Sequence, residues 1–202
     1  MNITELFLRD HARVHAKGVG EAEAGMYLED LVLGGLTDEQ VRARPNGMNS
    51  LAWVFFHMAR SEDTGVNVVV ASRTQVFDDG WAQRLGLDFT HIGTGMSDDE
   101  VADFSGKLNV AELRAYRKAV GLRTREIVAA LRSEEWDEIL GPDAVERMKG
   151  AGGIGPNADW LAEMFGGKSK ALILGHVGTG HNFWHLGEAI TVRSLAGLRL
   201  PI

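Results

Sequence analysis

The sequence predicts an all-α protein, a four-helix bundle with long connections. Three observations support this fold class. Apolar residues recur at helical spacing in four long segments, whereas the alternation typical of strands is weak throughout. Residues that begin or end helices stand at the ends of these segments. The 202 residues, 45% of them hydrophobic and 24% charged, suit one helical domain, residues 1–202, with a sizeable core.

The first long helix is expected at about residues 2–33. It ends at the glycine pair Gly34–Gly35, which suits a left-handed C-terminal cap. A short helix should follow Thr37, because Thr37 and Gln40 have the spacing of a capping box. That helix stops before Pro45, and the PNG sequence there is typical of a turn.

Asn49 or Ser50 caps the second long helix, which should reach about residue 71. Its LAWVFFHMA sequence is apolar around the whole circumference, so we expect the most buried helix of the protein here. A long connection with several glycines follows at residues 72–96, and connections of this length carry function or short helices. The SDDE sequence after it has the spacing of a capping box and predicts a brief helical turn.

The third long helix begins at Asn109 and reaches about residue 132, with one apolar stripe and a basic opposite face. Residues 141–157 are rich in glycine and proline and predict a loop. A short helix is expected at 158–165, and the fourth long helix at about 169–196, closed by a glycine. Four amphipathic helices with two long connections are typical of a bundle.

Composition excludes several classes of function. The net charge of −7 and the lack of a basic run argue against a nucleic-acid partner, since phosphate contacts need clustered lysine and arginine. The chain has no cysteine, which excludes disulfides, thiolate catalysis and cysteine-ligated zinc. No apolar run is long enough to span a bilayer, and the first residues turn to charge at once, so we expect no membrane partner and a cytoplasmic protein.

Three of the seven histidines stand in the sequence GHVGTGHNFWHLGEA. His181 and His185 are four residues apart and therefore share one face of the fourth helix. Glu188, Val192 and Leu195 continue the same row, so the pair should face the bundle core. Two imidazoles at this spacing match a metal chelate, although a buried histidine is often only hydrogen-bonded.

The chain has a second pair of histidines with this spacing, but a possible third ligand is evident only for the first pair. His11 and His15 have the same spacing, but charged residues surround them, so we expect both to be exposed. His57 stands in the most apolar segment, where burial of an imidazole without a partner costs about 1–3 kcal/mol. His57, His181 and His185 could converge across the core. Three protein ligands leave one coordination position open, as catalytic metal sites do.

The sequences NSLAWVFFHMARSED (49–63), GTGMSDDEVADFS (93–105) and HNFWHLGEAI (181–190) together resemble the DinB/YfiT-like superfamily of metal-dependent enzymes. The similarity spans nearly the whole chain. It implies a four-helix bundle, commonly a homodimer, with one divalent ion, nickel or zinc, held by His57, His181 and His185. Characterised relatives include transferases and isomerases that use mycothiol or bacillithiol, and metal-dependent hydrolases.

Two classes of function follow. The first is a metal-dependent enzyme, a hydrolase or a thiol transferase, whose ion activates water or a low-molecular-weight thiol for reaction with a small molecule. The alternative is a non-catalytic, stress-response protein that binds a metal or small ligand. Glu188 is the candidate for a further catalytic role, but it could equally orient a ligand histidine, act as a fourth ligand, or form a surface pair.

Other residues near the proposed ligands have less specific predictions. His176, five residues before His181, should face another direction. Glu62 and Asp63 lie about 140° or more around the helix from His57, so we expect salt bridges or cap contacts there. Core packing is the stronger expectation for the neighbouring aromatic residues, some of which could wall a pocket: Trp53, Phe55, Phe56, Phe183 and Trp184.

Overall fold

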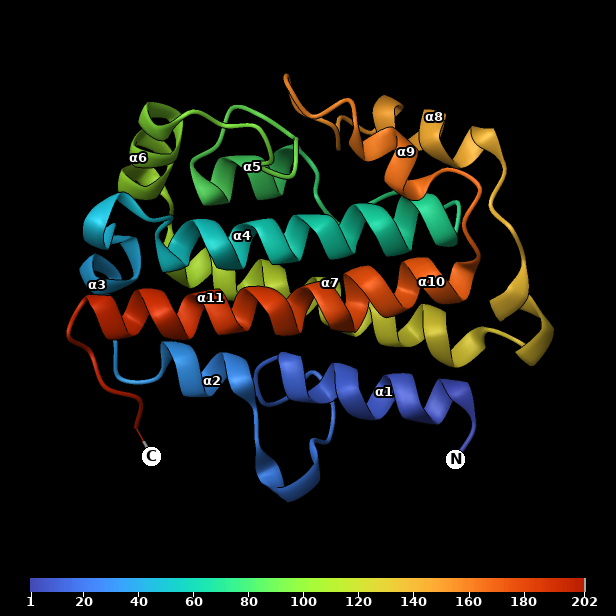
Figure 1. Ribbon diagram of the computed structural model, residues 1–202, viewed down its shortest axis with the longest axis horizontal. Coiled ribbons are helices and arrows are strands. Elements are labelled where there is room, and N and C mark those ends of the chain that lie inside the picture. Colours follow the sequence, from blue (N-terminus) through green and yellow to red (C-terminus); the bar gives the residue numbers. More distant parts are fainter. Residues whose placement is uncertain (202) are drawn as a thin grey trace.

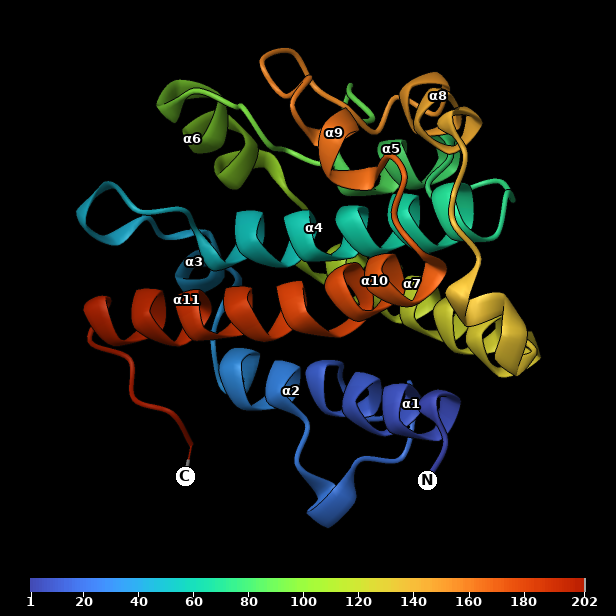
Figure 2. The ribbon, with the colours of Figure 1, turned by 45° about the vertical axis from the view of Figure 1, so that its right-hand side comes forward.

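Two long helices form the centre of the molecule. In the computed structural model, which describes residues 1–201, α4 (Leu51–Glu62) and α11 (His181–Leu195) lie side by side and run in opposite directions (Figure 1). The third long helix, α7 (Val110–Ala130), packs behind α4. On the far side of α11, α1 (Ile3–Val14) and α2 (Leu28–Leu33) follow one another (Figure 2). The all-α prediction is confirmed, with no β-strand in the described part of the chain.

Both central helices contain a π-helical segment. After α4 the chain continues as the π-helix η3 (Asp63–Val70), and α10 (Lys170–Leu174) leads through the π-helix η5 (Gly175–Gly180) into α11. The predicted second and fourth long helices are therefore confirmed as continuous helical rods. Their wider π-helical turns, with i→i+5 hydrogen bonds, are not evident from the sequence.

The N-terminal prediction of one helix over residues 2–33 is wrong. α1 ends at Val14, and an irregular stretch precedes α2. Gly18 has a φ of 92°, a left-handed conformation that glycine adopts without strain and that interrupts a right-handed helix. Residues 1–201 contain three short 3-10 helices. Glu23–Gly25 lies in this stretch, and the others are Pro45–Gly47 and Ser133–Asp137.

Shorter helices cover α4 on the side away from α11. The long connection at 72–96 contains α5 (Asp79–Leu85), and the capping box at Ser97 begins α6 (Asp98–Lys107), which is longer than the brief turn expected. The prediction of a loop at 141–157 is wrong, because this segment contains α8 (Pro142–Gly150). Proline is favoured in the first turn of a helix, and α8 buries three apolar side chains: Ala144, Val145 and Met148.

Two other short helices agree with the sequence. α3 (Asp38–Arg42) begins with the predicted capping box, and α9 (Leu161–Phe165) lies within the predicted segment 158–165. All twelve residues of α4 are buried, as expected of the most apolar segment. No helix in residues 1–201 combines the length and apolar character needed to cross a bilayer.

Candidate metal centre

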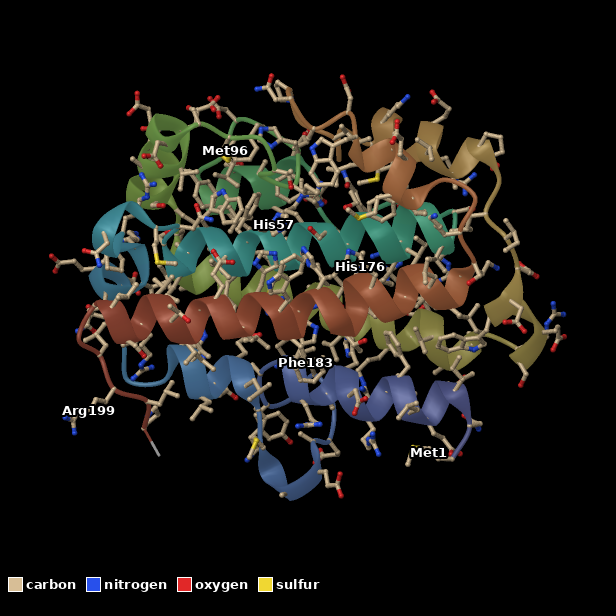
Figure 3. All side chains as sticks on the ribbon, in the orientation of Figure 1. Met1, His57, Met96, His176, Phe183 and Arg199 are labelled. Carbon is tan, nitrogen blue, oxygen red and sulfur yellow. The ribbon has the colours of Figure 1, made fainter. Side chains whose placement is uncertain are left out.

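Three imidazoles meet where α4 packs against the start of α11. The Nε2 atoms of His57 and His181 are 3.1 Å apart, and the ring centroid of His185 lies 4.8 Å from that of His57 and 4.4 Å from that of His181. One ligand atom from each residue lies within 4.8 Å of the other two. Figure 3 labels His57 on α4. From the sequence, helical spacing paired His181 with His185, and the apolar surroundings of His57 marked it as a possible third ligand. The structure places the three side chains together.

The hydrogen-bond partners of Nδ1 determine which nitrogen carries the proton in two of the rings, His57 and His185. His57 Nδ1 lies 2.8 Å from the carbonyl oxygen of Ile92, so this nitrogen carries the proton and donates it. His185 Nδ1 donates to a carboxylate oxygen of Glu188 at 2.6 Å, and Asn49 donates to the other oxygen at 3.3 Å. In both rings the proton on Nδ1 leaves a lone pair on Nε2. Glu188 is thus a partner of His185, one of the roles weighed from the sequence.

Burial keeps two of the rings neutral. Together with a smaller effect of the nearby His185, it lowers the pKa of His57 to about 4. It also lowers the pKa of His181 to about 2, with His57 the next contributor. Neutral imidazoles are the form in which histidine binds a metal, so these rings need not lose a proton before binding at pH 7.

The donor set fits a divalent transition metal. Two nitrogens bound to one tetrahedral ion at about 2.0–2.1 Å lie about 3.4 Å apart, close to the separation of the His57 and His181 Nε2 atoms. His181 Nδ1 is buried without a hydrogen-bond partner among the described residues, so this ring has no competing contact on that side. Three neutral imidazoles would leave an ion its full charge and an open position.

A cavity of about 390 Å³ opens onto the three rings. Trp53 stacks on His57 with a centroid separation of 4.9 Å, and Trp184 stacks on His185 at 6.1 Å. Apolar side chains from α9 and from the connection before α6 form the other walls: Ile92, Met96, Leu161, Met164 and Phe165. Among the described residues that line it there is no aspartate, glutamate, lysine or arginine.

The five aromatic residues near the proposed ligands have two different positions in the structure. Trp53 and Trp184 line the cavity. Phe55 and Phe56 are fully buried in the main hydrophobic core, and Phe183 packs against that core. Core packing therefore accounts for the phenylalanines, as the sequence favoured, whereas both tryptophans face the cavity.

His176 also lines this cavity, which corrects the prediction that it faces elsewhere. Its ring centroid is 5.4 Å from that of His181. In Figure 3, His176 is labelled between α4 and the rod formed by α10 and α11. The reason is the π-helix η5, in which residues five apart come into register, unlike those of an α-helix. Burial lowers the pKa of His176, and His185 adds to the effect. No α-helical spacing rule could have found this residue.

The prediction that His11 and His15 are exposed is wrong, because both are fully buried. Their rings contact Glu62 at the end of α4, which is fully buried too. The charged neighbours of these histidines occupy the outer face of α1, whereas the row that begins with Phe7 faces inward. Both acidic residues are paired inside the protein: Glu62 hydrogen-bonds to these two histidines, and Asp63 forms a salt bridge with Arg60, one of the roles predicted for it.

Comparison with known proteins identifies a matching family and a solved structure with a similar fold. The family model described as the DinB superfamily matches residues 23–189. A search of curated proteins found no match. Among solved structures, a conserved protein from Enterococcus faecalis has a TM-score of 0.67 and 16% sequence identity, over 96% of this chain and 97% of that one. At this identity the likeness concerns the fold.

Proposed function

The chain belongs to the DinB superfamily, and on that premise we propose that it is a metal-dependent enzyme whose His57, His181 and His185 hold one divalent transition ion, nickel or zinc. The observation that carries this proposal is the convergence of three imidazoles at the floor of an apolar cavity. When bound, such an ion supplies Lewis acidity, which lowers the pKa of a water molecule or a thiol at the open position.

Protein groups around the site would prepare it for this chemistry. The Ile92 carbonyl oxygen and the Glu188 carboxylate hold the Nδ1 protons of two ligand rings and so direct their Nε2 atoms inward. His176 stands beside the ligands with its pKa lowered by burial. A neutral imidazole there can accept the proton that a water or thiol loses, which assigns His176 the role of general base.

The walls indicate the kind of substrate. An ionised group entering this cavity would lose its hydration and find no charged side chain to pair with among the described lining residues. We therefore expect the part of the substrate that enters the cavity to be uncharged. A thiol with carboxylates, such as bacillithiol, is less compatible with these walls than an uncharged thiol such as mycothiol. Because the chain has no cysteine, the thiol of a transferase reaction comes from outside.

Metal analysis tests the site before any reaction is known. Nickel and zinc contents are measured by mass spectrometry in the wild type and in His57→Ala, with His91→Ala as control because His91 lies outside the cavity lining. We expect His57→Ala to hold one ion fewer per chain than the wild type, and the control to equal the wild type. Equal contents in all three proteins would refute the proposal.

Activity assays then separate the reactions. The metal-loaded protein is tested for hydrolysis of p-nitrophenyl acetate and for transfer of mycothiol to monobromobimane, with His176→Gln in parallel. We expect turnover in one assay and its loss in His176→Gln with metal content retained. A loaded protein that binds such molecules but turns none over is the non-catalytic binding protein of the alternative hypothesis. Sedimentation of the same samples tests the homodimer that the family resemblance implies.

A further inference from the structure

A second cluster of possible metal ligands lies deeper in the bundle. His11 and His15 of α1 and Glu62 of α4 each place a ligand atom within 4.8 Å of the other two. His11 Nε2 is 2.8 Å from Glu62 Oε1, and His15 Nε2 is 3.0 Å from Glu62 Oε2. All three side chains are 0% exposed. The two histidines precede residues 23–189, so the family match does not include them.

The charge around Glu62 is not balanced by a basic side chain. Among the described residues, the ionisable side chains within hydrogen-bonding distance of its carboxylate are His11 and His15, and neither carries a permanent charge. The buried Arg117 nearby donates instead to Glu29 at 2.7 Å and to the Asn182 side-chain oxygen at 2.9 Å. A buried carboxylate without a compensating cation is costly. The pocket around Glu62 therefore requires a positive charge, which either a proton on a histidine or a bound cation supplies.

The donor atoms match the chemistry of a divalent metal. Two histidines and a glutamate are a ligand set that binds zinc. A nitrogen and an oxygen bound to one ion at about 2.1 Å, at angles between about 90° and 109°, lie about 3.0–3.4 Å apart. Of the two histidine–glutamate distances, 3.0 Å lies at the lower end of this range and 2.8 Å lies slightly below it. Two imidazole nitrogens and both carboxylate oxygens supply four donor atoms.

Asn182 orients the glutamate. Its side-chain nitrogen donates to Glu62 Oε2 at 3.3 Å and to the Val177 carbonyl at 2.8 Å, while its oxygen accepts from Arg117. These partners fix which end of the amide faces Glu62. Asn182 is thus a positioning residue that links the cluster to α11, one residue from His181 of the first site.

We propose that His11, His15 and Glu62 form a second, closed site for a divalent transition metal such as zinc, with a structural role. Closure follows from the complete burial of all three ligands, which leaves no access for a substrate. The ion would join α1 to the end of α4, the point at which the π-helix η3 begins. The first site opens on a cavity, so the two sites differ in access as catalytic and structural metal sites do.

The test measures zinc in a protein whose first site has been removed. His57→Ala, His181→Ala and His185→Ala are combined in the full chain, which is expressed with added zinc, passed over a chelating resin and checked for helical content by circular dichroism. We expect the triple variant to retain one zinc per chain. Adding Glu62→Gln, or His15→Gln, should remove that zinc, whereas adding Glu146→Gln, an exposed carboxylate on α8, should not.

A second readout uses stability and does not depend on the Glu62 variant folding. Zinc bound only to the native state should raise the melting temperature of the triple variant, and a chelator should lower it. A folded triple variant that retains no zinc, and whose melting temperature zinc leaves unchanged, would overturn the proposal and show a purely hydrogen-bonded triad. If the triple variant does not fold, the wild type decides: two ions per chain support the second site, and a single ion refutes it.

Discussion

At the scale of single residues, the hydrogen bonds made by Nδ1 orient two of the proposed ligand histidines. Glu188 accepts from His185 Nδ1, and the Ile92 carbonyl accepts from His57 Nδ1. Both contacts turn an Nε2 lone pair toward the centre of the cluster. Burial raises the pKa of Glu188, but the hydrogen bonds from His185 and Asn49 contribute to an opposite effect that outweighs burial, and the pKa lies below its ordinary value. Glu188 is therefore ionised at neutral pH and available as an acceptor.

Substituting Glu188→Gln should weaken metal binding without removing a ligand. The amide accepts a weaker hydrogen bond from His185, so the ring loses orientation and basicity, and affinity should fall about 10–100-fold. Metal affinity is measured by competition with a chromogenic chelator. Glu163→Gln, a carboxylate on α9 outside this hydrogen-bond network, is the control and should not change it. An unchanged affinity in Glu188→Gln would show that this carboxylate does not support the site.

Acid should destabilise the metal-free protein. Burial lowers the pKa of His15, His57 and His181, to about 3, 4 and 2. In the unfolded chain these rings titrate near 6.5, so below that pH the unfolded state binds protons that the folded state excludes. The free energy of unfolding should fall as pH decreases from 7 to about 5, each ring contributing up to about 1.4 kcal/mol per pH unit. Urea unfolding across this range measures the slope. A free energy independent of pH would contradict it.

At the scale of the elements, the two π-helical segments place the histidines. η3 follows α4 directly and η5 precedes α11 directly, and the two segments contact one another. Their close approach depends on glycine: a Cβ on Gly65 would lie 2.9 Å from Val177 Cγ2. The wide turn of η5 also brings His176 to the cavity beside His181.

Gly65→Ala should destabilise the protein by about 1–3 kcal/mol, because the added methyl group would lie 2.9 Å from a buried valine, which would have to shift. Gly187→Ala is the matched control on the exposed face of α11, where an added Cβ meets nothing within 4 Å. That change should stabilise by about 0.5–1 kcal/mol through helix propensity. Chemical denaturation measures both. Equal effects would show that the contact between η3 and η5 is not tight.

For the whole molecule, one buried arginine connects four helices. Arg117 of α7 donates to Glu29 of α2, to the carbonyl oxygen of Val14 at the end of α1, and to Asn182 of α11. Both Arg117 and Glu29 are buried. Burial raises the pKa of Glu29, although Arg117 opposes the shift. The N-terminal helices are thus held to the bundle by a polar network as well as by apolar packing.

Arg117→Met should cost about 3–5 kcal/mol of unfolding free energy, since it leaves Glu29 buried without its partner. The exposed pair of Arg114 and Asp30 supplies the comparison, and Arg114→Met should change stability by less than about 1 kcal/mol. Urea unfolding at pH 7 measures both variants. Similar small losses in the two variants would show that the network is dispensable. Adding Glu29→Gln to Arg117→Met should recover part of the loss.

Much of the fold could be predicted because helix signals are local. Ser50, Thr37, Ser97 and Asn109 each cap the helix that the sequence assigned to them. The clustering of His57 with the pair on α11 was also predictable, from helical spacing and from an imidazole in an apolar segment. α8 was missed because glycine and proline dominate its surroundings and its buried stripe has only three residues.

The sequence alone determined where the long helices α4, α7 and α11 lie and that His181 and His185 share a face, since both depend on residues within a few turns of one another. Only the tertiary structure decided that His11 and His15 are buried, because that depends on Glu62, which lies 51 residues from His11 and 47 from His15 and to which both hydrogen-bond. It likewise decided that His176 reaches the cavity, because a π-helical turn forms where η5 packs against neighbouring helices. Spacing within one helix cannot specify what another helix brings to it.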